Sequence, residues 1–430
     1  MKEFYLQPKL ISSLKGYNGK QLLNDVIAGI IVAIIALPLS IALAMASDVP
    51  PERGIYTAVA AGFVVALLGG SRIQIAGPTA AFATIVAGVV ASQGLDGLFL
   101  ATVMAGILLV IMGVCKLGVL IKYMPHTITV GFTGGIAVTI LLGQIKDFLG
   151  LSYAEGVKPI ETLEKIEANI VALGNVDLSN LWALLVGAVA LAILIVYPKF
   201  EKRVPPSLIA VVVTVLMVQF IPGLNGVKTI GDLGAIPQGL PKLELGGMDL
   251  SVGRILELIP DAFTIAILAA IESLLSCVVA DGMVNSKHNP NAELVAQGFG
   301  NIASAFFGGI PATGAIARTS ANAKNGGRTP IAGMVHAVVL LLVLLFLMPA
   351  AELIPMPTIA AILFMVAYNM SEYKKFIEIF KTKKWTDIVV LVITFVLTVV
   401  FDLVVAIAVG IAVQLVFWLT GKIVTACRKA

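Results

Sequence analysis

Two charged side chains stand where the chain is otherwise apolar, Glu272 and Arg318. Glu272 lies in an apolar run that holds no other ionisable group between Asp261 and Asp281. Arg318 lies in GGIPATGAIARTSANAKNGGRTP, which begins at residue 308 and mixes charge with helix-breaking glycine and proline. A charge at the centre of a bilayer costs at least about 2.5 to 3.5 kcal/mol and usually marks a functional site. If these segments cross a membrane, both residues are candidates for binding or carrying an ion.

The composition of the chain predicts that these segments cross a membrane. Of the 430 residues 59% are hydrophobic and 13% are charged, with a mean hydropathy of +1.00, whereas water-soluble domains carry about a quarter charged residues. Fourteen apolar runs approach the length needed to span a bilayer, although the third and tenth are too short to cross alone. We therefore expect an all-α polytopic membrane protein with spans near 23–46, 55–70, 78–91, 96–115, 126–145, 180–197, 206–221, 255–281, 291–307, 315–326, 331–350, 357–370, 386–401 and 403–420.

Lysine and arginine fix the expected orientation, because they accumulate in cytoplasmic loops. A cytoplasmic N-terminus places 21 of them inside and 7 outside, with Arg318 left over. Both termini are then cytoplasmic, as segments 1–22 and 423–430, and we expect no removable signal peptide. The segment YKKFIEIFKTKKW, from Tyr373, is expected to lie on the cytoplasmic membrane surface as an amphipathic helix.

The two halves of the chain share one pattern. Each has an aspartate, a long apolar span, a second aspartate, a span ending in Gly-Gly, a short extended run and a glycine-containing break before a small-residue helix. The breaks are IAGPT in the first half and PATGA in the second. Seven spans in each half turn the second copy upside down, so we expect inverted repeats over 23–240 and 241–422. Paired interrupted helices of this kind indicate a secondary transporter whose site lies where the breaks meet.

Four motifs carry a resemblance to a known family: SRIQIAGPTAAFA, AIESLLSCVVADGM, NAELVAQGFGNI and GGIPATGAIARTSAN. They resemble the sulfate permease (SulP) anion transporters, and within that family the bacterial C4-dicarboxylic acid transporters, over residues 25–422. The resemblance implies a core domain (spans 1–4 and 8–11), a gate domain (spans 5–7 and 12–14), a homodimer and the bacterial inner membrane. Family members usually carry a cytoplasmic STAS domain after span 14, so the resemblance covers the membrane domain only.

The resemblance also implies an anion site between the starts of spans 3 and 10. A helix start carries about half a positive charge and unsatisfied N–H donors, so two facing starts favour an anion. Arg318, in the first turn of its helix, can add its guanidinium, and Leu39 stands where many relatives have glutamine. The expected substrate-binding residues are Leu39, Leu43, Thr79, Ala80, Ala81, Gly314, Ala315, Ala317 and Arg318.

Glu272 is the expected proton-coupling residue. Two helix starts and Arg318 sum to about +2, which an ionised Glu272 reduces to about +1. A dianion then suits the protonated carboxyl group, whereas a monoanion suits the ionised one, with Na⁺ held near Glu272 and Ser276. Two structural alternatives remain open: Arg318 reaches the surface or pairs with an acid, and Glu272 only pairs with Arg318 to hold two spans together.

The expected function is proton-coupled uptake of C4-dicarboxylates such as succinate or fumarate by alternating access. Sulfate/proton and bicarbonate/sodium symport stay open within the same fold, and a passive anion channel is the alternative from another class. We expect no enzyme, because no nucleophile or metal-ligand spacing is present. No cofactor and no nucleic acid are expected, and the partners are a small anion, the coupling ion and the lipid bilayer.

Overall fold

The protein is described by a computed structural model that covers residues 6–119, 125–154, 157, 159, 161–176, 178–201, 204–233, 237–243, 249–401 and 403–427. Among these residues, six helices are long and apolar enough to cross a bilayer, and shorter apolar helices accompany them. The six are Gly19–Ala46, Pro51–Leu68, Ala80–Val114, His126–Leu149, Asn180–Lys199 and Val252–Val284. The expected helical membrane architecture is confirmed.

By its internal contacts the chain divides into two compact units. The first contains Met1–Ile121, Asp147–Gly150 and Asp177–Ile362. Its helices are α1 (Lys9–Ser13), α2 (Gly19–Ala46), α3 (Pro51–Leu68), α4 (Ala83–Val114), α7 (Leu178–Val196), α8 (Pro206–Phe220), α9 (Val252–Val284), α10 (Pro290–Phe306), α11 (Ile316–Lys324), α12 (Ile331–Phe346), α13 (Met348–Glu352) and the start of α14 (Met356–Met370).

The second unit contains Lys122–Lys146, Leu151–Val176 and Leu363–Ala430. It holds most of α5 (His126–Leu149), then α6 (Thr162–Leu173), α15 (Tyr373–Lys381), α16 (Trp385–Val400) and α17 (Leu403–Cys427). Phe376 of α15 packs edge-on against Phe395 of α16. On the same short helix Tyr373, Ile377 and Phe380 remain exposed, as a helix lying at a membrane surface requires.

Every expected span has a helix at its place. The third and fourth expected spans lie within α4, where Gly94 departs from helical geometry with φ 72° and ψ 179°. The helix α6 is an addition, because no helix was expected between the fifth and sixth spans. The first unit contains α7 and α8 beside the helices expected for the core, and the core-and-gate division itself stays a prediction.

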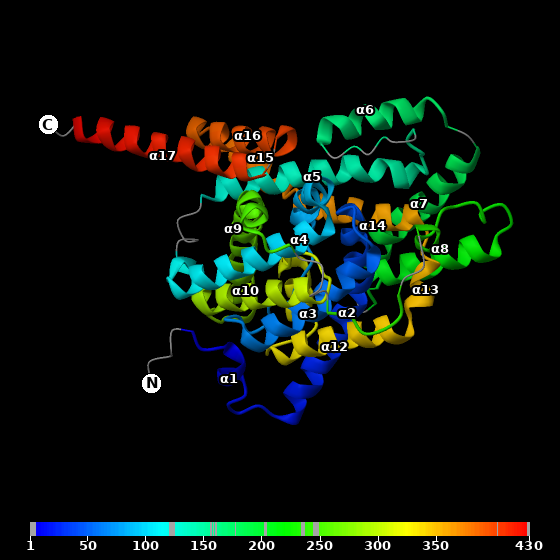
Figure 1. Ribbon diagram of the computed structural model, residues 1–430, viewed down its shortest axis with the longest axis horizontal. Helices are drawn as coiled ribbons and strands as arrows, with labels where there is room; N and C mark the ends of the chain where they lie inside the picture. The colour runs from blue at the N-terminus through cyan, green and yellow to red at the C-terminus, as the bar shows by residue number, and fades with distance from the viewer. Residues whose placement is uncertain are drawn as a thin grey trace. The chain divides into compact units, whose positions relative to one another are not determined.

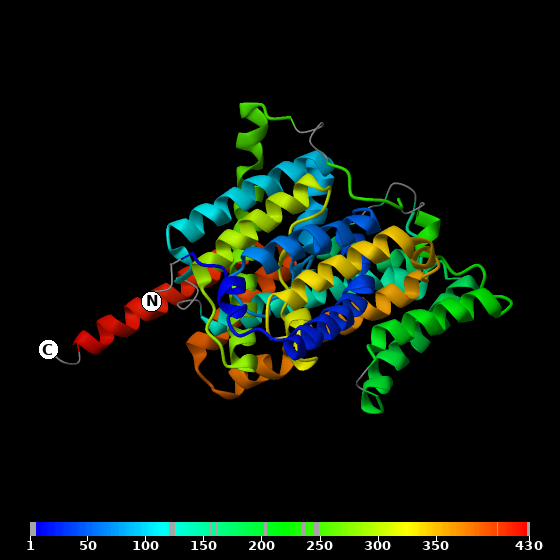
Figure 2. The same ribbon diagram turned by 90° about the horizontal axis from the view of Figure 1, so that it is seen from below.

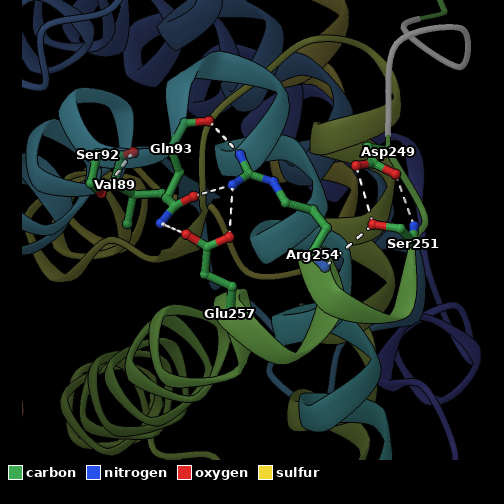
Figure 3. A network of polar contacts seen from close by, with 7 residues as sticks. All are labelled: Val89, Ser92, Gln93, Asp249, Ser251, Arg254 and Glu257. Carbon is green, nitrogen blue, oxygen red and sulfur yellow. Dashed lines mark hydrogen bonds and ion pairs between the residues drawn. The ribbon is translucent and has the colours of Figure 1, made fainter.

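A polar cluster secures the break at Gly94. Gln93 is the last residue before the break in α4. Its carbonyl oxygen accepts a 2.7 Å hydrogen bond from Nη2 of Arg254, near the start of α9. Nη1 of Arg254 also contacts the Gln93 side chain and lies 3.2 Å from the Glu257 carboxylate. Figure 3 shows these contacts converging on Arg254, beside Ser251, which caps α9. A cationic side chain thus satisfies a carbonyl that helix termination leaves without a partner.

A second cluster joins the two halves at the expected cytoplasmic side. Asp25 of α2 is fully buried and accepts hydrogen bonds from Arg328 N at 2.7 Å and Thr329 Oγ1 at 2.6 Å, just before α12. The Tyr17 hydroxyl donates to the same carboxylate at 2.9 Å. Burial and this bond to Asp25 raise the pKa of Tyr17 to about 12, so the hydroxyl stays protonated and donating at neutral pH.

The centre of the first unit is a row of closely packed helices. In this row α4, α10, α3, α12 and α2 each contact the next, and they lie side by side in Figures 1 and 2. Small residues permit the approach: a Cβ atom added at Gly106 of α4 would lie 2.7 Å from the Gly298 carbonyl oxygen of α10. Close backbone contact at small residues is a common basis of helix association in membranes.

This contact predicts opposite effects of the same substitution at two positions of α4. Gly106→Ala should destabilise the protein by about 1–3 kcal/mol, because the methyl group overpacks the contact with α10. Gly88→Ala is the matched control, since nothing lies within 4 Å of the added Cβ, and it should be neutral or slightly stabilising. Thermal unfolding in detergent measures both, and equal melting temperatures for the two variants would contradict the packing shown here.

Candidate functional site

The two breaks meet through a short antiparallel β-pair within the first unit. Strand β1 (Ala76–Gly77) pairs with β2 (Thr313–Gly314), Ala76 opposite Gly314 and Gly77 opposite Thr313. The expected breaks IAGPT and PATGA contain these strands, and Ala315 N extends the pairing with a 2.8 Å bond to Ile75 O. Backbone that leaves the helical pattern inside a membrane protein must find other partners, and here each break supplies them for the other.

Both strands lead directly into helix starts. After β1, Thr79 precedes a 3₁₀ turn, Ala80–Phe82, that continues into α4. After β2, Ala315 is the N-cap of α11, and no side chain caps that helix. The first N–H groups of both helices therefore remain available for an external acceptor. The geometry offers a site for an anion at two helix starts.

Glu272 reaches the first of these helix starts. Its side chain, 8% exposed, projects from α9, and its Oε2 accepts a 2.8 Å hydrogen bond from Thr79 Oγ1. Arg318 is not its partner: the ion pairs between described residues join Arg254 with Glu257, His288 with Asp281 and Lys375 with Glu372. The structural alternative in which Glu272 pairs with Arg318 is therefore wrong for this structure.

Arg318 lies in the first turn of α11 and is 1% exposed. Its Nη2 donates a 2.8 Å hydrogen bond to Pro78 O, so it bridges from the second break to the first. Its Nε and Nη1 have no hydrogen-bond partner among the described residues. Nη1 lies so close to Gly77 that a Cβ atom there would collide with it. The guanidinium therefore does not reach the surface, and its charge lies against Gly77 of β1.

The other expected site residues differ in their burial. Leu43 is buried in α2, which contacts α11, while Leu39, one turn earlier, is partly exposed. The small residues Ala80, Ala81, Gly314 and Ala315 are buried, and Ala317 is exposed. These residues offer backbone donors and little side-chain chemistry.

Ser276, expected near a sodium ion, is fully buried and donates a 3.3 Å hydrogen bond to Thr319 Oγ1. The described residues contain no cluster of three or more His, Cys, Asp or Glu that could hold a metal. Sodium can be held by oxygen ligands of other kinds, and the hydroxyl of Ser276 and the carboxylate of Glu272 occupy successive turns of α9.

Two hydroxyl residues hold the breaks and were missed from the sequence. Ser273 Oγ accepts from Gly314 N at 3.0 Å and lies 2.7 Å from Thr313 Oγ1. Thr319 Oγ1 accepts from Ile75 N at 3.1 Å. A serine one residue after Glu272 and a threonine one residue after Arg318 were visible signals, since membrane helices use such hydroxyls to satisfy neighbouring backbone.

Three further polar residues lie in apolar helices. His336 of α12 is fully buried, and neither of its ring nitrogens has a hydrogen-bond partner among the described residues. Gln144 of α5 is buried, and His126, at the start of the same helix, is exposed.

The chain is similar in sequence to a known protein family and to several of its members. Residues 22–394 match the Sulfate permease family. The chain is 44% identical over 384 residues to "Putative sulfate transporter YvdB" of Bacillus subtilis, covering 89% of this chain and 70% of that protein. It is 34% identical to the bicarbonate transporter BicA of Picosynechococcus, covering 81% of this chain and 62% of that protein.

A solved structure shows the same fold. The transmembrane domain of a cyanobacterium bicarbonate transporter BicA aligns with a TM-score of 0.80 and 31% identity, covering 91% of this chain and 98% of that one. The chain spans a little under two thirds of the full Picosynechococcus relative.

The position of Arg318 predicts that it acts on an anion through its charge. At an effective dielectric constant of about 20 and a separation of about 8 Å, one charge contributes about 2 kcal/mol, or about thirtyfold in affinity. Arg318→Gln should weaken sulfate or bicarbonate binding by about that factor, whereas Arg318→Lys should retain most of it. Ligand-dependent melting of the purified protein measures the affinities. Equal losses in both variants would show that hydrogen-bond geometry, rather than charge, determines binding.

Proposed function

The chain belongs to the sulfate permease family, and we propose that it is a secondary active transporter that moves a small anion by alternating access. In this proposal the anion binds at the starts of α4 and α11, and Glu272 carries the coupling cation. One observation supports it above the others: Thr79, at the helix start proposed to bind the anion, donates a hydrogen bond of 2.8 Å to the Glu272 carboxylate. Binding of a proton or Na⁺ there changes the charge that an anion meets.

The charge of the site relates the transported anion to the occupancy of Glu272. Two helix starts contribute about +1 and Arg318 adds +1, while an ionised Glu272 subtracts 1. Protonation of Glu272 leaves about +2, which matches a dianion such as sulfate or a C4-dicarboxylate. Sodium bound beside an ionised Glu272 restores the same total, whereas an ionised Glu272 alone suits a monoanion such as bicarbonate. Charge therefore selects between a dianion and a monoanion, and H⁺ and Na⁺ act alike on it.

We propose a small inorganic oxyanion as the substrate, with sulfate first and bicarbonate second. The relatives reported above are named for these two anions, and buried alanines at both helix starts leave backbone N–H groups as the chief donors. A C4-dicarboxylate presents the same paired oxygens, and it remains the third substrate to test. No cofactor enters the proposal.

The remaining proposals concern the membrane location, orientation and oligomeric state of the protein. We place the protein in the bacterial cytoplasmic membrane with both termini inside, because the lysine and arginine distribution favours that orientation. A homodimer is proposed from family resemblance. Coupling through Glu272 favours a transporter over a passive channel, since a passive pathway has no need for a cation-binding carboxylate at the anion site.

Uptake into proteoliposomes tests the proposal. Labelled sulfate, bicarbonate and succinate are supplied with an inward proton gradient, an inward sodium gradient or neither. One anion should accumulate under one gradient, and Glu272→Gln should reduce that accumulation at least tenfold. Glu257→Gln is the control, because Glu257 lies on the same helix but is largely exposed.

Exchange separates the two coupling modes. With proton coupling, Glu272→Gln resembles the protonated residue, so equilibrium exchange of labelled anion should persist while gradient-driven uptake disappears. With sodium coupling, the variant should lose both. Gradient-driven uptake that Glu272→Gln leaves unchanged would remove Glu272 from the mechanism, and large unitary currents would favour the channel.

A further inference from the structure

We infer that α10 is the element that positions both halves of the anion site, through Glu293 at one end and Asn301 at the other. This inference rests on the proposed anion transport at the two breaks, and it assigns positioning residues to that site. Both side chains are fully buried in a helix that contacts α3, α4 and α9. Glu293, Gln297 and Asn301 are spaced by four residues, so they share one face of α10.

Glu293 holds the segment that leads into β1. Its Oε2 accepts hydrogen bonds from Gly70 N at 2.9 Å and Ser71 N at 3.2 Å. Its Oε1 accepts from Gln74 Nε2 at 2.9 Å and from Gln297 Nε2 at 2.9 Å. A carboxylate with four donors and no ion pair among the described residues is an acceptor matched to these N–H groups.

Gln74 passes this constraint on to the strand. It lies two residues before β1, and its Nε2 also donates to Ser273 O of α9 at 3.2 Å. Its amide lies so close to Gly314 that a Cβ atom there would collide with it. Through Gln74, Glu293 is therefore connected both to the segment that leads into β1 and to Gly314, the second residue of β2.

Asn301 holds the segment that leads into β2. Its Nδ2 donates to Ala312 O at 2.9 Å, and its Oδ1 accepts from Ala312 N at 2.9 Å. The same side chain donates to Gln297 O at 2.8 Å. Ser304, on the next turn, donates to Ile310 O at 2.7 Å. The paired bonds at Ala312 imitate a strand neighbour immediately before β2.

The two attachments are eight residues apart, about 12 Å along a helix. The helix between them is fixed by the close contact of Gly298 with Gly106 of α4. A displacement of α10 would therefore shift the segments that lead into β1 and β2, and with them the two helix starts. This is the geometric reason for assigning positioning, beyond packing, to Glu293 and Asn301.

The variants Glu293→Gln and Asn301→Leu test the inference. Each keeps the approximate size of its side chain. Glu293→Gln replaces one accepting oxygen by a donor and so opposes two of the four bonds, Asn301→Leu removes the bonds to Ala312, and Thr102→Val is the control. Thr102 is equally buried but bonds only to Leu98 O of its own helix among the contacts described. We expect KM for the transported anion to rise about tenfold in the first two variants, with a smaller change in kcat, and neither to change in Thr102→Val.

Amide hydrogen exchange on the folded protein supplies a readout independent of transport. Glu293→Gln should speed exchange in residues 69–78, and Asn301→Leu in residues 308–316. Gln297→Leu removes one hydrogen bond to Glu293, and its side chain bonds to neither break. This variant should therefore fold even if the other two do not, and its KM should rise less.

The outcomes separate the possibilities. Variants that lower thermal stability while KM and exchange at the breaks stay at wild-type values would overturn the inference and leave a packing role. A wild-type protein that moves none of the three anions would overturn the proposed function, while the exchange pattern would still decide whether α10 positions the breaks. Faster exchange at the matching break together with a raised KM supports both.

Discussion

The antiparallel pairing of Ala76–Gly77 with Thr313–Gly314 is the interaction on which the site depends. Inside a membrane protein, backbone that leaves the helix loses its internal partners, and each unsatisfied group costs several kcal/mol. Pairing one break with the other removes part of this cost, and Ser273, Thr319 and Asn301 satisfy further groups. Since the strands lead into α4 and α11, the same bonds that stabilise the breaks also place two helix starts beside each other.

This arrangement explains how a site can bind an anion with few polar side chains. The N–H groups and partial charges of the helix starts are fixed by the fold, so they need no ordering when an anion enters. Arg318 adds a full positive charge beside β1, and its Nη2 donates a hydrogen bond to Pro78 O. Glu272 opposes that charge from the other side through Thr79. In the proposed mechanism the net charge of the site follows the occupancy of this one carboxylate.

The sequence was informative where local rules apply. Apolar runs located the helices, and glycine and proline at matching places in IAGPT and PATGA located both strands, because these residues disfavour continuous helix. The length of the apolar runs also separated the third from the fourth span. The structure places that separation at Gly94, whose positive φ is accessible to glycine at little cost.

The partners of the buried polar residues could not be predicted in the same way. Thr79 and Glu272 are 193 residues apart in sequence, and Gln74 and Glu293 are 219 apart. Arg318 was expected at the anion site, with pairing to an acid as the alternative, and its position in α11 directs its Nη2 to a carbonyl of the opposite break. Glu293 carried no signal of its role, since three of its donors belong to a distant glycine-rich turn and to Gln74 beyond it. Such contacts depend on how helices pack, which single-sequence patterns do not specify.

Selenate, a heavy analogue of sulfate, offers the most direct test that the paired breaks form the anion site. Crystals grown with selenate would give an anomalous difference peak wherever the anion binds. The account predicts a peak about 4 Å from backbone nitrogens of residues 79–81 and 316–317 together, because selenium lies one Se–O bond beyond an oxygen that accepts at about 3 Å, and loss of that peak in Arg318→Gln. A peak that lies away from both breaks, or one that touches a single helix start and persists in Arg318→Gln, would contradict it.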